Sequence, residues 1–171
     1  MIEKFHSTSI GVLHLVVEDN ALIKCKWHDN SKPCHNDGSQ SSGNAGIEES
    51  KDLILLEKTL QEIDLYLEGK LKSFSIPIRL TGTPFQQRVW EVISKIPYGE
   101  TISYGELAEK VGNPKGSRAV ARACGANPIG LIVPCHRVVG SNGKLGGYTG
   151  GVDKKISLLN LETLLSNKII L

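Results

Sequence analysis

The sequence lacks any long apolar run. No stretch of it reaches the roughly 18 consecutive apolar residues that a membrane-spanning helix needs. The first residues, Met1-Ile2-Glu3-Lys4, also lack the apolar core and cleavage site of a secretory signal peptide. We therefore expect no membrane partner, and a cytoplasmic location or, in a eukaryotic cell, a nuclear one.

Cysteine is scarce, with four in 171 residues. Without an export signal, these cysteines indicate free thiols in a reducing compartment, where a thiol is more often catalytic, buried or metal-bound than paired in a disulfide. Cys25, His28, Cys34 and His35 are of metal-ligand types, but their spacing matches no common zinc pattern. We predict no metal site.

Acidic residues are absent from positions 110 to 152. Basic residues are not, and this stretch contains Lys110, Lys115, Arg118, Arg122, Arg137 and Lys144. A segment with charge of one sign attracts a polyanion such as nucleic acid. A solvated surface that happens to lack acids explains the pattern equally well, so charge alone leaves both interpretations open.

The first 80 residues predict a small α+β domain. Two strand-like runs, 12–17 and 21–27, are separated by a short turn and indicate a β-hairpin. Residues 29–52 are rich in Ser, Asn, Gly and acids, and we expect them to form a long mobile loop. Helical spacing of leucines predicts a helix over 53–69, and alternation predicts a strand over 74–80.

The second part, residues 81–171, predicts a mostly helical domain. Thr83 with Gln86 can form a capping box that opens a helix over 85–96. A last helix is expected after Asp153, which can cap it. Glu162 lies on the apolar side of that helix, so it needs a partner, which is either a structural arginine or lysine or a catalytic imidazole.

Two short helices flank a turn at 113–116, inside the acid-free segment. The first opens with a capping box at 103–106 and is ended by Gly112. Ser117 can cap the second, which runs to about Cys124. This arrangement is typical of a helix-turn-helix, and a plain helical hairpin is the alternative.

The second of these helices is built from small side chains and two arginines, Arg118 and Arg122. Small side chains allow a helix backbone to approach its partner closely. This favours a shallow fit in the minor groove of DNA over base recognition by long polar side chains. Close packing on another helix inside the protein is the alternative.

The chemistry-bearing residues follow an apolar run, 129–133. Thiolate is a nucleophile that a neighbouring base or cation favours, and Cys135 is followed by His136 and Arg137. Adjacency in sequence is weak evidence, because neighbours on a strand point to opposite faces. The glycine-rich segment 140–151 can bring backbone close to a ligand, or it is a surface loop.

The segment Pro134-Cys135-His136-Arg137-Val138 resembles the O6-alkylguanine-DNA alkyltransferases, also called methylated-DNA–protein-cysteine methyltransferases. The similarity runs from about 85 to about 165 in order and spacing, whereas the first 80 residues share only the family's layout. Further matching segments are 96–100, 103–104, 112–114, 118–120, 127–128, 147–148 and 150–151.

The resemblance implies a set of catalytic roles. Cys135 is similar to the alkyl acceptor, and His136 to the base that acts on it through a water. Glu162 is similar to the carboxylate that orients this imidazole. Tyr104 matches the donor that neutralises charge on the departing guanine, and Asn127 the hinge that braces the Cys135 loop.

Other residues match the family's binding elements. Tyr148 and Thr149 resemble the pocket wall, with the Thr149 N–H near O6, and the carbonyls of Cys135 and Val138 would accept from the guanine amine. Arg118 resembles the finger that replaces a flipped nucleotide in the minor groove. The remaining residues expected at the DNA are Lys115, Ser117, Ala119 and Arg122.

The resemblance thus implies an α+β protein whose C-terminal domain carries a winged-helix-like helix-turn-helix for DNA. It would act as a monomer on double-stranded DNA, moving alkyl groups from O6 of guanine, and by extension O4 of thymine, irreversibly and once to Cys135. No cofactor is expected, because the DNA supplies the alkyl group. Arg122, where many relatives have glycine, and Gly125, where some have arginine, are departures that affect the expected phosphate contacts.

Two other functions compete with this one. A module that binds DNA lesions without transfer would not need Cys135, and a Cys-His hydrolase would turn over beyond one equivalent.

Overall fold

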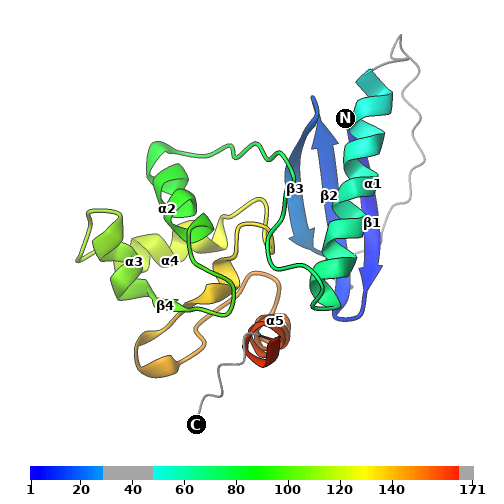
Figure 1. Cartoon of the computed structure of the whole chain (residues 1–171). Coiled ribbons are helices and arrows are strands. Elements are labelled where there is room, and N and C mark those ends of the chain that lie inside the picture. Colours follow the sequence, from blue (N-terminus) through cyan, green and yellow to red (C-terminus); the bar gives the residue numbers. More distant parts are fainter. Residues whose placement is uncertain (29–47, 166–171) are drawn as a thin grey trace.

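A computed structural model describes residues 1–28 and 48–165. The first half of the chain forms a three-stranded antiparallel sheet in the order β1-β2-β3, with a helix packed along it (Figure 1). Its elements are β1 (Ile2–Thr8), β2 (Gly11–Glu18), β3 (Ala21–Trp27) and α1 (Glu48–Leu67). The predicted hairpin is confirmed as β2 and β3. Asp19 and Asn20, both with positive φ, form its turn.

Strand β1 was not predicted from the sequence. It pairs with β2 along its whole length, from Ile2 opposite Val17 to Thr8 opposite Gly11. As an edge strand it has no fully buried side chain, so no apolar face marks it in the sequence.

Helix α1 begins five residues before its predicted start, so the predicted loop 29–52 is wrong at its C-terminal end. The polar composition of residues 48–52 hid a buried contact. Asp52 is 6% exposed and accepts a hydrogen bond of 2.7 Å from the backbone N–H of Asn20, which ties this segment to the β2–β3 hairpin. The rest of the predicted loop, 29–47, lies outside the described residues, and so do Cys34 and His35.

The predicted strand over 74–80 is also wrong. The segment makes one isolated bridge, between Ile78 and Leu22 of β3. Pro77 has no N–H to donate, so pairing cannot extend through it. The alternation in the sequence nevertheless reflects packing, because Ile76 is buried and Phe74 packs against the core.

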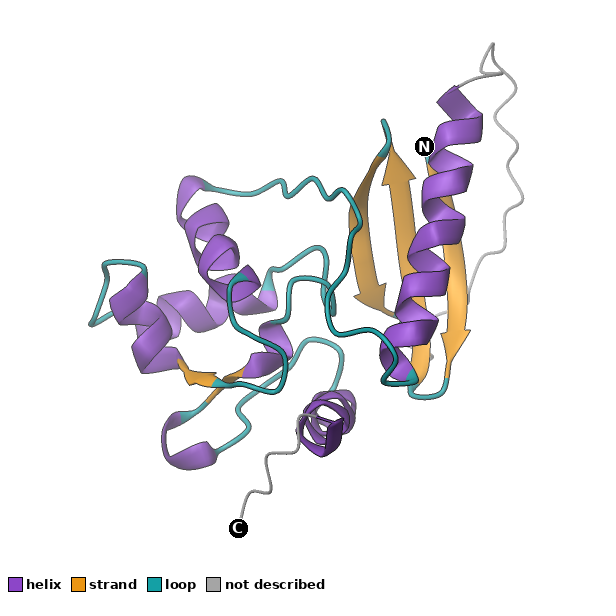
Figure 2. Ribbon diagram, viewed as in Figure 1, coloured by secondary structure: helices purple, strands orange, loops and turns teal. Residues whose placement is uncertain are grey.

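The second half of the chain is mostly helical (Figure 2). Its elements are α2 (Pro84–Ser94), β4 (Ile102–Ser103), α3 (Tyr104–Lys110), α4 (Ser117–Gly125), η1 (Cys135–Arg137), β5 (Val138–Val139), η2 (Ser141–Gly143) and α5 (Val152–Leu165). Both predicted capping boxes, at 83–86 and 103–106, are confirmed. Gly112, with φ of 77°, follows the end of α3 as predicted.

Two predicted caps are wrong. Ser117 is the first residue of α4, and the cap position belongs to Gly116, which makes no side-chain cap. The space beside Gly116 is taken by Asn113, whose Nδ2 would lie 2.1 Å from an added Cβ. Asp153 lies inside the first turn of α5, where its carboxylate still faces the positive end of the helix dipole.

Helices α3 and α4 form the helix-turn-helix, and both pack against α2 (Figure 1). The expected packing of α4 inside the protein is confirmed for one face of the helix, and the fit in the DNA minor groove stays a prediction for the other. Val120, Ala123 and Cys124 are buried, and Trp90 of α2 donates to the Ala123 carbonyl at 2.8 Å, so one face packs tightly inside the protein. The other face, with Arg118 and Arg122, is exposed.

The α+β fold class is confirmed. One hydrophobic core extends through both halves of the chain, and the N–H of Cys25 in β3 donates to the Pro128 carbonyl at 2.9 Å. Within residues 1–28 and 48–165, no helix has the length and apolar character to cross a membrane.

Candidate active site

Cys135 begins the short helix η1, at the end of a tightly turned loop. Within that loop, buried Leu131 has a φ of 73°, a sparsely populated conformation that its surroundings must maintain. Asn127 supplies much of that support. Its Nδ2 donates to the Val133 carbonyl at 2.9 Å and to Cys135 Sγ at 3.4 Å, while its Oδ1 accepts from the Ile129 N–H at 3.0 Å. One side chain therefore holds the loop and the thiol together.

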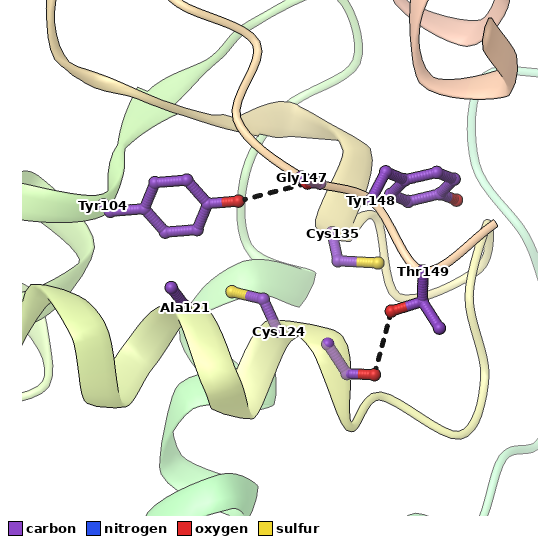
Figure 3. A pocket seen from close by; sticks show the side chains of 8 residues that line it. Tyr104, Ala121, Cys124, Cys135, Gly147, Tyr148 and Thr149 are labelled. Carbon is purple, nitrogen blue, oxygen red and sulfur yellow. Dashed lines mark hydrogen bonds between the residues drawn. The ribbon is translucent and has the colours of Figure 1, made fainter. Parts of the chain in front are cut away.

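The Cys135 side chain, 8% exposed, lines a cavity of about 380 Å³ (Figure 3). The lining comes from α3, α4, η1 and the glycine-rich segment, and consists of Tyr104, Ala121, Cys124, Gly125, Cys135, Gly147, Tyr148 and Thr149. The Tyr104 hydroxyl lies 3.5 Å from the Gly147 carbonyl, and the Thr149 hydroxyl donates to the Gly125 carbonyl at 3.0 Å. The predicted pocket residues Tyr104, Tyr148 and Thr149 thus meet at Cys135.

His136 and Glu162 are in contact with each other. His136 Nε2 lies 3.0 Å from Glu162 Oε1, and both side chains are almost fully buried. Burial lowers the pKa of His136 despite the neighbouring carboxylate, so the imidazole is neutral at neutral pH. Its Nδ1 is buried and has no hydrogen-bond partner among the described residues, which leaves that nitrogen able to accept a proton.

Glu162 has an arginine partner as well as the imidazole. Arg137 Nε lies 3.0 Å from Oε2, and Arg137 NH2 lies 2.8 Å from Oε1. The Tyr66 hydroxyl of α1 and the Gly99 N–H also donate to this carboxylate. Burial alone would raise the pKa of Glu162, but the hydrogen bonds from His136 and Arg137 hold it at about 2.

Arg137 therefore does not belong to a basic surface. It is one of the basic residues of the acid-free segment, yet its side chain is 7% exposed. Its N–H groups donate to Glu162 and to the Ile96 carbonyl. Both alternatives left open for Glu162, a structural arginine and an imidazole, are present together.

Lys155 is a site residue that was not predicted from the sequence. It is fully buried on α5, and its ammonium donates to the carbonyls of Val138, at 2.7 Å, and of Leu145. It thereby links the strand after η1 to the glycine-rich segment. A signal was available, because Lys155, Leu158 and Glu162 share one face of α5. The Val138 carbonyl keeps a second lone pair for another donor.

The resting thiol of Cys135 is predominantly protonated at neutral pH. Burial raises its pKa, and the effects of Asn127 and Lys155 in the opposite direction do not cancel that rise. Because the thiolate is the nucleophile, this cysteine needs a base. The neutral imidazole of His136 is the adjacent candidate.

The residues predicted to face DNA lie together on α4 and the turn before it. Lys115, Arg118 and Arg122 are exposed, while Ser117 and Ala119 are partly exposed. The same helix contributes Ala121 and Cys124 to the wall of the Cys135 cavity. One helix therefore connects the exposed basic residues to the thiol. No group of three or more metal-ligand side chains that could hold a metal occurs in the described part of the chain.

Two family profiles match the chain. One, described as the DNA-binding domain of 6-O-methylguanine DNA methyltransferase, matches residues 84–164. The other, described as the ribonuclease-like domain of the same protein, matches residues 1–80.

Individual relatives agree with these profiles. A methylated-DNA–protein-cysteine methyltransferase of Mycobacterium leprae is 53% identical over 105 residues, which are 61% of this chain and 64% of the relative. The match thus spans less than two thirds of that relative's length. One of Methanosarcina mazei is 48% identical over 67% of this chain and 71% of its own. The crystal structure of Mycobacterium tuberculosis OGT in complex with DNA has a TM-score of 0.79 and 37% identity, covering 95% of this chain and 93% of that one.

Proposed function

Because this chain belongs to the O6-methylguanine DNA methyltransferase family, we propose that it repairs alkylated DNA by taking the alkyl group onto its own Cys135. The observation that carries the proposal is the position of this thiol. It opens into a cavity large enough for a base, and the next residue, His136, is paired with buried Glu162 of α5 at 3.0 Å.

The reaction is a single displacement at the alkyl carbon of O6-alkylguanine. His136 accepts the thiol proton through a water, and Glu162 stabilises the imidazolium that forms. The sulfur then forms a bond to the alkyl carbon while the bond from that carbon to O6 breaks. Negative charge develops on the departing guanine, where the Tyr104 hydroxyl is a donor at the cavity wall. The product is a thioether, so the protein acts once.

DNA is the partner on this proposal. The target atom is inaccessible inside a duplex, so the nucleotide must be flipped out of the stack. Helix α4 carries the exposed residues for this task. Arg118 would fill the vacated stack from the minor groove, and Lys115 and Arg122 would contact phosphate. Small residues such as Ala119 would allow the helix to approach closely, and Asn127 would brace the acceptor loop behind it.

The intact mass of the protein after incubation with duplex DNA containing O6-methylguanine tests the proposal. We expect an increase equal to one CH2, because the methyl group replaces the thiol hydrogen. We also expect no further reaction, and the methyl group on the peptide that contains Cys135. Cys135→Ser should still bind the DNA but gain no mass. A methyl group found on Cys25, Cys34 or Cys124 would overturn the assignment of the acceptor. Product beyond one equivalent would indicate a hydrolase, and binding without transfer a lesion-recognition module.

A further inference from the structure

The first half of the chain contributes one side chain to the buried imidazole–carboxylate pair, and the proposed mechanism leaves it unused. Tyr66 lies near the end of α1 and is fully buried. Its hydroxyl donates to Glu162 Oε1 and lies 3.4 Å from His136 Nε2. These two atoms lie 3.0 Å from each other. The hydroxyl, the carboxylate oxygen and the imidazole nitrogen are therefore all in mutual contact.

The Tyr66 hydroxyl is held in a fixed place by the packing of its ring. The ring centre lies 5.0 Å from that of Phe74, and Tyr98 packs edge to face against it at 5.9 Å. Close packing around a buried ring leaves its torsion angles little freedom. The hydroxyl is thus a donor whose position α1 sets before any substrate arrives.

The Glu162 carboxylate has a second partner that competes with the imidazole. Arg137 Nε lies 3.1 Å from Oε1 and 3.0 Å from Oε2, and Arg137 NH2 lies 2.8 Å from Oε1. A guanidinium is always charged, whereas burial keeps the resting imidazole neutral. Arg137 is therefore the stronger partner and does not by itself keep Oε1 at His136. The Tyr66 hydroxyl on Oε1 and the Gly99 N–H on Oε2, at 3.1 Å, fix the rotation of the carboxylate.

We propose that Tyr66 is a positioning residue for alkyl transfer, because its hydroxyl holds Glu162 Oε1 against His136 Nε2 and so keeps the lone pair of His136 Nδ1 for the thiol proton. An ionised carboxylate can only accept a hydrogen bond, so the imidazole proton stays on Nε2 while Oε1 faces it. Nδ1 is the buried nitrogen that has no hydrogen-bond partner among the described residues. Once the carboxylate turns away, the proton can move to Nδ1, and the base is blocked.

The inference rests on the proposed function only for its effect on repair, because the hydrogen bonds themselves need no DNA. Its test is the tautomer of His136, read from proton–nitrogen correlation spectra of the protein with isotope-labelled histidine, and His136→Gln assigns the signal. The wild type should carry its ring proton on Nε2 alone. Tyr66→Phe should show both tautomers. Its single-turnover rate of methyl transfer from duplex DNA should fall roughly tenfold, which corresponds to one hydrogen bond.

Two control variants remove comparable groups. Tyr98→Phe removes a neighbouring hydroxyl that has no hydrogen-bond partner among the described residues, and it should keep both the tautomer and the rate. Trp27→Phe removes another donor from the first half. Trp27 is the last residue of β3, and its indole Nε1–H donates to the Tyr148 hydroxyl at the pocket wall, at 3.3 Å. Among the described contacts it reaches neither His136 nor Glu162, so this variant should keep the tautomer.

A ring proton on Nδ1 in the wild type, or a single Nε2 tautomer in folded Tyr66→Phe, would overturn the proposal. So would a Tyr66→Phe protein that shows both tautomers and an unchanged rate. The wild-type spectrum decides the first point even if Tyr66→Phe fails to fold. If the tautomers behave as expected but the wild type takes no methyl group from DNA, the hydrogen-bond arrangement stands and the repair function fails.

Discussion

At the scale of single residues, the proposed mechanism assigns the nucleophile and the base to two neighbouring residues, Cys135 and His136. Cys135 is buried and its thiol pKa is raised. The thiol therefore stays protonated and reacts slowly with alkylating agents until a base removes its proton. His136 is kept neutral by burial and can serve as that base. The Glu162 carboxylate stays ionised over the whole physiological range, since its pKa is about 2. A fixed negative charge next to a neutral imidazole favours proton uptake at the moment of reaction.

Glu162→Gln should therefore slow alkylation by roughly 10²-fold, in line with the loss of general-base help. It should also move the rate profile to higher pH. The measurement is the single-turnover rate of methyl transfer from duplex DNA between pH 6 and 9. The variant leaves Arg137 without its charge partner, which costs about 3 kcal/mol of stability, so the rates should be taken at a temperature where circular dichroism shows a folded protein.

Glu62→Gln is the control for this variant. Glu62 is also a buried glutamate, 9% exposed, but it accepts from Ser75 and belongs to α1. Its replacement should leave the rate profile unchanged. If Glu162→Gln keeps the wild-type profile as well, Glu162 only supports the fold.

At the scale of elements, α1 reaches from the sheet to the Glu162 carboxylate. Tyr66, near its end, is fully buried and donates to Glu162. Tyr66→Phe should lower the free energy of unfolding by about 1.5 kcal/mol, because a hydrogen bond to a charged group is lost. Urea denaturation measures this.

Tyr98→Phe is the comparison. The Tyr98 hydroxyl is buried without a hydrogen-bond partner among the described residues, so its removal should leave the stability unchanged or raise it. Equal losses in the two variants would mean that the hydroxyl of Tyr66 contributes nothing through Glu162.

Helix α4 has a different task, since its exposed face holds the predicted DNA contacts. Arg118→Ala should strongly slow repair of O6-methylguanine in a duplex, because the flipped state loses its support. It should barely change the reaction with free O6-benzylguanine, which needs no unstacking. Lys115→Ala and Arg122→Ala should instead weaken binding to DNA of any sequence and reduce its salt dependence.

Arg79→Ala controls for the loss of one positive charge. Arg79 is an exposed arginine paired with Glu18 and Asp19 at the β2–β3 turn, away from α4. An Arg118→Ala protein that is impaired equally on both substrates would refute the finger role and place Arg118 among the residues that support the fold.

The elements also show what a sequence pattern can predict. Capping boxes and helical spacing are local, so α2, α3 and the hairpin were predicted correctly. The strand expected at 74–80 failed because alternation reports burial, whereas strand pairing needs backbone donors that Pro77 lacks. Strand β1 was not predicted, because an edge strand is identified by the strand it pairs with and not by its own sequence.

In the candidate site, too, some residues could be predicted from the sequence and others could not. Cys135, His136 and Glu162 were assigned through resemblance, and the structure places His136 in contact with Glu162 directly after Cys135. Tyr66 and Trp27 were missed because they are distant in sequence from the residues they contact. Only folding reveals such neighbours.

At the scale of the whole molecule, the buried site makes stability depend on pH. The pKa of His136 is lowered in the folded state, so the unfolded chain takes up a proton first as the pH falls below about 6.5. Stability should then decrease by at most about 1.4 kcal/mol per pH unit for this one group. The pKa of Glu162 is also lowered, so the stability that this carboxylate contributes is lost as the pH falls from about 4.5 to about 2.

Urea denaturation at pH 7.5 and pH 5.0 checks the first part. The wild type should be less stable at pH 5.0, and His136→Gln should show a smaller difference between the two. A difference that is the same in both proteins would show that His136 does not take up its proton on unfolding.

The contacts of Glu162 and Tyr148 have a consequence for inheritance. Tyr66 and Trp27 come from the segment matched by one family profile, and the residues they hold come from the segment matched by the other. A recombination event that joined the first segment of one relative to the second segment of another would have to preserve a phenol and an indole at these two positions. Otherwise the hybrid protein would lose the hydrogen-bond donors to the Glu162 carboxylate and to the Tyr148 hydroxyl. We therefore expect substitutions at these contacts to be accepted in pairs.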